Sequence, residues 1–250
     1  MSTTPGSPID PIYALAQRFK YLRLSDVSDG LDSVGRPTVG LVDPAIRPLW
    51  LGMKVWGVAV TERMVPANRP MPPLNGRKSH AAWYREESLF GRSTVGEHIR
   101  TGSVLVTSTG ESGECGRWGS SNALAMIERG AVGIVTSGYC RDTFEVALQK
   151  TPIACRARGR TIIPGRLECA GVQEPVDLGG ALVRPGDIVG CDDDGVIVVP
   201  HEVAAEVLRF GAGILVGDVK ARRGRYERLG IPLDDTVAVE VIEPFYADLL

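Results

Sequence analysis

Residues 103–157 decide the fold, and they read SVLVTSTGESGECGRWGSSNALAMIERGAVGIVTSGYCRDTFEVALQKTPIACRA. Short apolar runs alternate here with helix-like stretches, which predicts strands at 103–107, 131–136 and 153–157 and helices at 121–129 and 142–149. A strand–helix–strand–helix–strand order is typical of a parallel sheet with right-handed crossovers. The segment therefore predicts an α/β fold with a βαβ core.

The chain before this segment is expected to add two helices, a strand and a third helix, at residues 12–22, 26–34, 55–60 and 80–90. Ser25 is the expected N-cap of the second helix. Prolines crowd residues 66–78, which predicts a long surface loop and a candidate active-site flap.

Beyond Val172 the alternation of strand and helix patterns ends, and Pro-Gly-Asp and Asp-Asp-Gly turns separate short apolar runs. Strands are expected near 182 and 188 and at 196–199, followed by a helix or helix pair over 201–228 that is interrupted around 211–217. We expect a single domain over residues 11–230. Residues 1–10 would form a flexible lead, 66–90 a flap-like insertion and 231–250 a C-terminal tail.

Composition excludes two classes of partner. The chain has 28 basic and 30 acidic residues, a net charge of −2, and no basic tail, so bulk electrostatic binding of nucleic acid is not expected. No apolar run approaches the roughly 18 residues of a membrane span, and the polar N-terminus lacks a signal core. We therefore expect a cytoplasmic protein whose five cysteines stay reduced.

The strongest candidate site follows the predicted strand at 131–136, where residues 137–142 read SGYCRD. Ligands of open α/β sheets collect at the carboxyl ends of parallel strands. Arg141 can bind a carboxylate in a bidentate manner, and Asp142 can ligate a hard divalent cation such as Mg²⁺. The structural alternative is that Asp142 caps the next helix while Arg141 forms a surface ion pair.

A second candidate site is the glycine-rich loop over residues 109–119 and the helix start that follows it. Backbone N–H groups at a helix start can hold a carboxylate or an enolate oxygen. The residues of this start are Gly119, Ser120, Ser121 and Asn122. Glu111 and Glu114 are candidates for acid–base catalysis or for contacting a metal-bound water. The alternative is a glycine-rich turn with solvated glutamates.

Other polar clusters have structural explanations. Three aspartates at 192–194 could bind a metal, but an Asp-Gly turn before a Val-Ile-Val-Val run favours a hairpin. The three histidines lack the spacing of a zinc protease, although His80 could line a pocket beside the proline-rich loop. The sequence contains no nucleophile-elbow or phosphate-loop motif.

Taken in order, several segments resemble the RraA-like family. They are GAVGIVTSG at 130–138 with the following Arg141-Asp142, SDVSDGLD at 25–32, RPGD at 184–187, and residues 192–200. The resemblance spans roughly residues 25–230. The family includes regulators of ribonuclease E activity and divalent-metal-dependent aldolases of 4-hydroxy-4-methyl-2-oxoglutarate and 4-carboxy-4-hydroxy-2-oxoadipate.

This resemblance implies an αββα sandwich core and a homotrimer or dimer of trimers, with active sites between subunits. It also implies that Arg141 holds a pyruvate carboxylate, that Asp142 ligates Mg²⁺ or Mn²⁺, and that the backbone of residues 119–122 binds pyruvate oxygens. This sequence departs from the family in one respect. The resemblance implies an aspartate that precedes the arginine with twenty residues between them, but this sequence has Ser120 at that position. Ser137 likewise stands where many members have Asp. Glu111 or Glu114 would then supply the acid–base group, or the reaction differs.

We therefore expect a metal-dependent carbon–carbon lyase that cleaves an aldol or decarboxylates a small 2-oxo or hydroxy carboxylic acid, such as oxaloacetate. Its partners would be this carboxylate and further copies of the chain. One alternative is a non-catalytic, protein-binding regulator of the ribonuclease E inhibitor type. Another is a metal-dependent hydro-lyase, isomerase or hydrolase that acts on an acidic metabolite.

Overall fold

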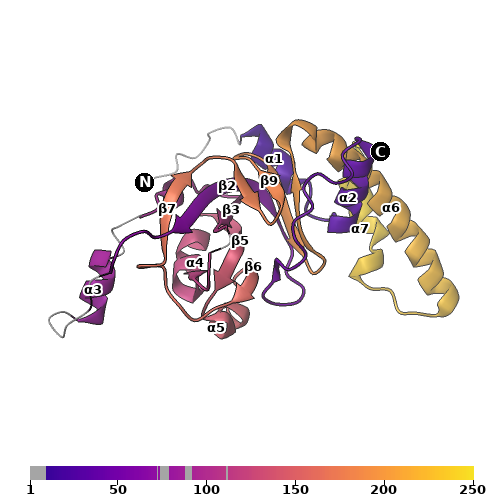
Figure 1. Cartoon of the computed structure of the whole chain (residues 1–250). Helices are drawn as coiled ribbons and strands as arrows, with labels where there is room; N and C mark the ends of the chain where they lie inside the picture. Colours follow the sequence, from indigo (N-terminus) through magenta and orange to yellow (C-terminus); the bar gives the residue numbers. More distant parts are fainter. Residues whose placement is uncertain (1–9, 72, 74–78, 88–91, 111) are drawn as a thin grey trace, which may run out of the picture.

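The computed structural model describes residues 10–71, 73, 79–87, 92–110 and 112–250 (Figure 1). Its helices are α1 (Pro11–Gln17), α2 (Leu24–Ser33), α3 (His80–Glu87), α4 (Ser120–Glu128), α5 (Thr143–Leu148), α6 (Ala204–Leu229) and α7 (Val239–Phe245). Its strands are β1 (Arg47–Pro48), β2 (Val55–Pro66), β3 (Ser103–Ser108), β4 (Gly116–Trp118), β5 (Ala131–Cys140), β6 (Ile153–Arg158), β7 (Leu167–Val172), β8 (Val176–Leu178), β9 (Ala181–Val183), β10 (Ile188–Asp192) and β11 (Gly195–Val199).

The strands form one large mixed sheet and a separate hairpin. The order in the sheet is β1-β6-β5-β3-β2-β10-β11, with β4 beside β5 and β7 beside β2, while β8 pairs only with β9. Pairing is parallel among β2, β3, β5 and β6 and between β4 and β5, and it is antiparallel for the other pairs. The predicted α/β architecture and its βαβ core over β3, α4, β5, α5 and β6 are confirmed.

Alternation along the central strands divides the core between the two faces of the sheet. On β3, Val104 and Val106 pack with the β8–β9 hairpin, while Leu105 packs with Ala123 of α4 and Val146 of α5. Successive side chains of a strand point to opposite faces, so a run that is buried throughout needs cover on both sides. A third apolar cluster joins α1, α2, α6 and α7 to β10 and β11.

The strand β2 is twice as long as predicted. The expectation ended at residue 60 because Thr61 and Glu62 interrupt the apolar run, yet both side chains are fully buried. Four further strands, β1, β4, β7 and β8, escaped prediction because their short segments show no clear period. The strands β1, β2, β4 and β7 pair with partners distant in the sequence, which a local pattern does not reveal.

The predicted break around residues 211–217 is wrong, because α6 runs unbroken for 26 residues. Gly211 lies where α6 crosses α2, and a Cβ at this position would be 3.1 Å from the carbonyl oxygen of Asp26. The glycine therefore allows close packing of the two helices and does not end α6. Among the described helices, α6 included, none has the length and apolarity needed to cross a bilayer.

The start of α2 also differs from the prediction. The helix begins at Leu24, and Arg23 occupies the N-cap position instead of Ser25. The carboxylate of Asp26 accepts a hydrogen bond from the backbone N–H of Arg23 at 2.8 Å and pairs with its guanidinium. This arrangement satisfies the helix start without a serine cap.

The ends of the chain differ in how they pack. Residues 231–250, expected as a tail, fold back along α6 through α7, and the buried hydroxyl of Tyr246 donates to the carbonyl oxygen of Arg18 at 2.9 Å. The expected lead over residues 1–10 lies outside the described residues except for Asp10, which caps α1. In Figure 1, α3 lies at one end of the molecule, and α6 and α7 lie at the other.

We expect Gly190→Ala to lower the free energy of unfolding by about 1–3 kcal/mol, because it overpacks the pairing of β10 with β2. A Cβ at Gly190 would lie 2.1 Å from the ring of Trp56. That ring cannot move away freely. Its centroid lies 5.2 Å from that of the Phe19 ring, and its Nε1 donates to the carbonyl oxygen of Leu22 at 3.1 Å. Urea denaturation measures the change. The control Gly213→Ala, in open space on α6, should match or exceed the wild type; equal stability of Gly190→Ala and wild type would contradict the packing.

Candidate functional site

A cavity of about 570 Å³ opens where β4 and β5 end. Its walls come from α3, the strand β4, the first turns of α4, the Arg141-Asp142 segment and Ile162-Ile163. The position agrees with the expectation that ligands collect at the carboxyl ends of parallel strands.

Arg141 and Asp142 both line this cavity. Asp142 has the left-handed backbone conformation (φ 52°, ψ 37°), which a non-glycine residue adopts at a cost in free energy. It occupies the N-cap position of α5, but its side chain makes no capping hydrogen bond. Instead, Oδ2 accepts from the backbone N–H and hydroxyl of Ser120 at 3.3 and 3.4 Å, and Oδ1 accepts from Nε of Arg141 at 3.2 Å. The backbone thus directs the carboxylate toward the start of α4.

Two glycines make room for this pair. A Cβ at Gly119 would lie 2.6 Å from Oδ2 of Asp142, and one at Gly116 would lie 2.9 Å from Cγ of Arg141. The glycines of the predicted glycine-rich segment therefore serve close approach between β4, α4 and the end of β5.

The start of α4 faces the cavity as predicted. Gly119, Ser121 and Asn122 line it, and Oδ1 of Asn122 accepts from the backbone N–H of Gly119 at 2.8 Å. Ser120 contributes through its two contacts with Asp142. Ser120 thus orients a carboxylate and does not supply one.

Of the two predicted acid–base glutamates, the structure describes only Glu114. Glu111 lies outside the described residues. Glu114 pairs with Arg160, at 2.8 Å from Oε2 to Nη2, and these hydrogen bonds lower the pKa of Glu114 to about 2. It is absent from the described lining of the cavity. This position favours a structural role for Glu114, which ties the glycine-rich loop to residue 160.

A buried ion pair that the sequence analysis missed joins Arg117, one of the residues that line the cavity, to Glu62. Arg117 donates from Nε and Nη2 to the two carboxylate oxygens of Glu62, at 3.0 and 2.6 Å, and Glu62 is fully buried. Thr107 donates its hydroxyl to Glu62 at 3.0 Å and accepts from Nε1 of Trp118 at 2.9 Å. Burial raises the pKa of Glu62, but the Arg117 charge and the hydrogen bonds from Arg117, Ser93 and Thr107 outweigh it and keep the pKa below its usual value.

A signal for this pair exists in the sequence. A glutamate inside an otherwise apolar strand requires a cationic partner if the strand is buried.

The helix α3, which lies in the segment expected as a flap, contributes His80 and Tyr84 to the cavity. This agrees with the interpretation of His80 as a pocket residue. No signal in the sequence marked Ile162 and Ile163, which supply apolar surface to the cavity.

The other clusters have structural explanations here as well. Asp187, His201 and Glu202 could contact one ion, but Asp187 already accepts from the backbone N–H groups of Arg184 and His201 at 2.8 and 3.0 Å. Residues 192–194 lie at the β10–β11 hairpin, as predicted.

The five cysteines are free thiols, and most of them are deeply buried. Burial raises the pKa of Cys115 and Cys155 to about 11, and it raises the pKa of Cys140 further. A thiol with a raised pKa is a poor nucleophile at neutral pH, because the thiolate is the reactive form. These thiols therefore contribute to packing.

The donor set around Asp142 fits a hard divalent cation. Its side chain is one-third exposed at the cavity, and it is the only carboxylate among the described lining residues. Mg²⁺ is typically held by one or two carboxylates and completes its coordination with water and substrate oxygens. Asp142 would hold such an ion, while Ser120 keeps the carboxylate in place.

A model of the RraA-like family (Aldolase/RraA) matches residues 24–198, well over half of the chain. The chain belongs to the RraA-like family. This RraA-like protein is 35% identical over 138 residues to a Bacillus cereus protein provisionally named 4-hydroxy-4-methyl-2-oxoglutarate aldolase, which covers 49% of the chain and 84% of that protein.

The chain is also similar to two further proteins. Protein DlpA of Legionella pneumophila is 28% identical over 199 residues, which cover 80% of this chain. DlpA is much the longer protein, and the match spans only 29% of its length. The solved structure of Streptomyces coelicolor RraAS2 superposes with a TM-score of 0.62 and 26% identity, covering 87% of this chain and 96% of that one. RraAS2 is described as an unusual member of the RNase ES inhibitor RraA family.

We expect Gly119→Ala to weaken Mn²⁺ binding at least tenfold, because the added methyl group displaces the Asp142 carboxylate. Isothermal titration calorimetry with Mn²⁺ alone measures this affinity. Gly113→Ala in the same loop meets nothing within 4 Å and serves as the matched control with unchanged binding. Equal Mn²⁺ affinity in the two variants would show that Asp142 does not hold the ion.

The Glu62–Arg117 pair predicts a loss of stability in acid. The pKa of Glu62 is lower in the folded protein than its usual 4.5, so its contribution is present above the unfolded pKa and is lost as the pH falls through the folded pKa. We expect the stability advantage of the wild type over Glu62→Gln/Arg117→Gln to shrink below pH 4.5.

Urea unfolding at stepped pH measures this advantage, and an advantage that is independent of pH would contradict the shift. Glu128→Gln, at an exposed position on α4, should follow the pH profile of the wild type.

Proposed function

We propose that this RraA-like protein is a divalent-metal-dependent lyase that breaks a carbon–carbon bond in a small 2-oxo or hydroxy carboxylic acid. The observation that carries the proposal is the convergence of the Arg141 guanidinium, the Asp142 carboxylate and the start of α4 on one cavity. These are an anion-binding group, a cation-binding group and a set of backbone donors.

Each group has a chemical task in this proposal. Arg141 binds the substrate carboxylate, and Asp142 would hold Mg²⁺ or Mn²⁺. When bound, the cation would supply Lewis-acid stabilisation of charge on the 2-oxo oxygen. The N–H groups of Ser121 and Asn122 offer further donors to the same oxygens, because they belong to the first turn of α4.

Proton transfer is assigned to groups other than residue 120. In aldol cleavage the hydroxyl proton leaves, the bond between the hydroxyl-bearing carbon and its neighbour breaks, and the electron pair forms an enolate that is then protonated. Ser120 lacks a carboxylate for this task. His80 lines the cavity, and an imidazole can both accept and donate a proton. Glu111 stays a second candidate.

The aldolase name of the Bacillus cereus relative supports a lyase. RraAS2 belongs to an RNase ES inhibitor family, and this supports the alternative of a non-catalytic regulator. A regulator would need neither a metal nor an intact cavity. The two functions therefore differ in what happens when the cavity residues are changed.

We expect Arg141→Ala and Asp142→Asn each to lower kcat/KM at least 100-fold, since removing one charge-stabilising group typically has an effect of about this size. The assays are decarboxylation of oxaloacetate and cleavage of 4-hydroxy-4-methyl-2-oxoglutarate, each with Mg²⁺, with Mn²⁺ and with a chelator. Asp32→Asn, exposed on α2, is the matched control and should retain full activity. A wild-type protein inactive with both metals on both substrates would exclude these lyase reactions and favour the regulator.

A further inference from the structure

We propose that a second cavity, between α1, β2 and α7, is a binding site for a small organic acid with an aromatic body. This second cavity has a volume of about 510 Å³. Its described lining residues include none of those that line the Arg141-Asp142 cavity. The inference does not depend on the proposed function, because it concerns a different part of the molecule and a different ligand.

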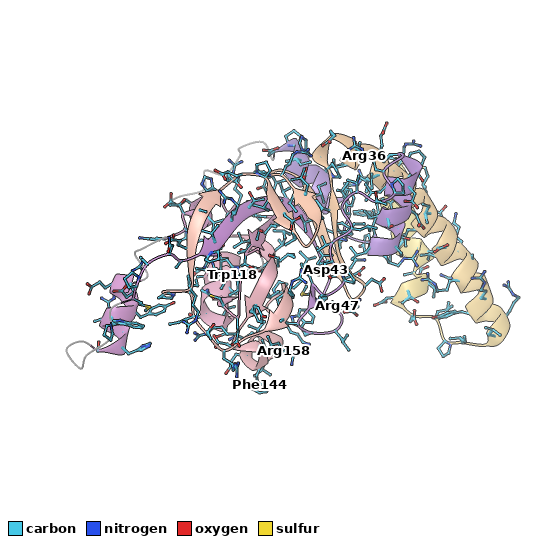
Figure 2. All side chains as sticks on the ribbon, viewed as in Figure 1. Arg36, Asp43, Arg47, Trp118, Phe144 and Arg158 are labelled. Carbon is cyan, nitrogen blue, oxygen red and sulfur yellow. The ribbon has the colours of Figure 1, made fainter. Side chains whose placement is uncertain are left out.

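The second cavity lies apart from the proposed lyase site. Its wall includes Trp56 near the start of β2 and Phe245 at the end of α7. The Arg141-Asp142 cavity borders α3 instead, and α3 and α7 lie at opposite ends of the molecule (Figure 1). Trp118, which precedes Gly119 of the Arg141-Asp142 cavity, lies well apart from α6 and α7 (Figure 2). The two cavities are therefore separate sites.

Two aromatic rings held in place form the apolar part of the wall. Trp56 and Phe245 are half-buried, so each leaves part of its ring surface for a ligand. The indole of Trp56 donates from Nε1 to the carbonyl oxygen of Leu22 at 3.1 Å. The ring of Phe245 meets the rings of Tyr21 and Tyr246 edge-on, at centroid distances of 4.8 and 4.9 Å. An aromatic ligand would thus meet surface that is already ordered.

Two lysine ammonium groups lie at the same cavity, and both contact Tyr21. Lys54 donates from Nζ to the carbonyl oxygen of Tyr21 at 2.9 Å, and Nζ of Lys20 lies 4.7 Å from the centroid of the Tyr21 ring. Neither lysine forms an ion pair within the part of the chain that the structure describes. An ammonium group has three donors and no acceptor, so both lysines keep donors for an anionic ligand.

The third cation of the wall, Arg18, is already neutralised. Its guanidinium donates to both carboxylate oxygens of Asp248, at 2.7 and 3.1 Å. No carboxylate is found among the described lining residues of the second cavity. The uncompensated charge of the wall therefore comes from Lys20 and Lys54, and it favours an anion over a neutral ligand or a cation.

The environment of Lys54 supports the same ligand class. Desolvation lowers the pKa of Lys54, and the charge of Arg23 acts in the same direction. The carboxylates of Asp192 and Asp26 raise the pKa, but they do not outweigh the desolvation. A carboxylate bound in the second cavity would stabilise the charged ammonium and offset this effect.

The test compares naphthalene-2-carboxylate with naphthalene-2-carboxamide, which share their rings and differ in charge. We expect the wild type to bind the carboxylate roughly 10-fold more tightly, because hydrogen bonds to a charged group are the stronger ones. Isothermal titration calorimetry of the full chain measures both affinities. Lys20→Gln/Lys54→Gln should lose this preference and keep the affinity for the carboxamide, because both lysines are exposed and their replacement leaves the rings in place.

A second variant tests the aromatic part of the site. Phe245→Leu should weaken the binding of both ligands by about 3-fold to 10-fold, the usual size of an aromatic pair contact. The matched control is Lys220→Gln/Arg228→Gln, which removes the same number of positive charges from residues outside the described lining of the second cavity. This control should bind both ligands as the wild type does.

Several outcomes would overturn the proposal. A wild type that binds neither ligand, or binds them equally, has no such site. A preference that survives in Lys20→Gln/Lys54→Gln would show that the carboxylate binds elsewhere, for example at Arg141. Unchanged affinity in Phe245→Leu would likewise exclude the second cavity as the place of binding.

Discussion

The parallel pairing of β5 with its neighbours is the constraint on which the site depends. β5 pairs with β3 and β6 along its length, and its last residues also pair with the short strand β4. The N–H of Arg141 then donates to the carbonyl of Trp118 at 2.9 Å, which joins the end of β5 to the residue before Gly119. This single backbone contact brings the Arg141-Asp142 segment against the start of α4.

A buried charge pair links this backbone arrangement to the cavity wall. Glu62 enters from β2 and Arg117 from β4, so the pair connects strands that are not neighbours in the sheet. Buried ion pairs contribute little net stability, but breaking one is strongly unfavourable. The pair therefore restricts where β4 can lie, and β4 carries the glycine that accommodates Arg141.

Local patterns in the sequence were sufficient for the βαβ core and for the Arg141-Asp142 segment. Strands and helices there follow clear periods, and the site lies at the end of the strand that the pattern identified. The Glu62–Arg117 pair could not be found in this way, because its members are 55 residues apart and meet only through the order of the strands.

Glycine was the other source of error. The glycines of α6 suggested a break in the helix, whereas Gly211 permits its contact with α2. Glu114 was a reasonable acid–base candidate by position, but the sequence does not show that Arg160 lies within reach of it. In both cases the sequence gives the residue type but does not reveal the partner that contacts it in the folded chain, which is α2 for Gly211 and Arg160 for Glu114.

At Asp142 the left-handed backbone conformation lowers the stability of the fold, while the side chain supplies the carboxylate of the cavity. An L-residue adopts this conformation at a cost on the order of 1 kcal/mol, which glycine avoids. Replacing Asp142 by glycine would relax the turn while it abolishes the carboxylate, so selection for thermal robustness alone would erode the site. At the end of β5 the chain therefore gives up some conformational free energy and gains a carboxylate that lines the cavity.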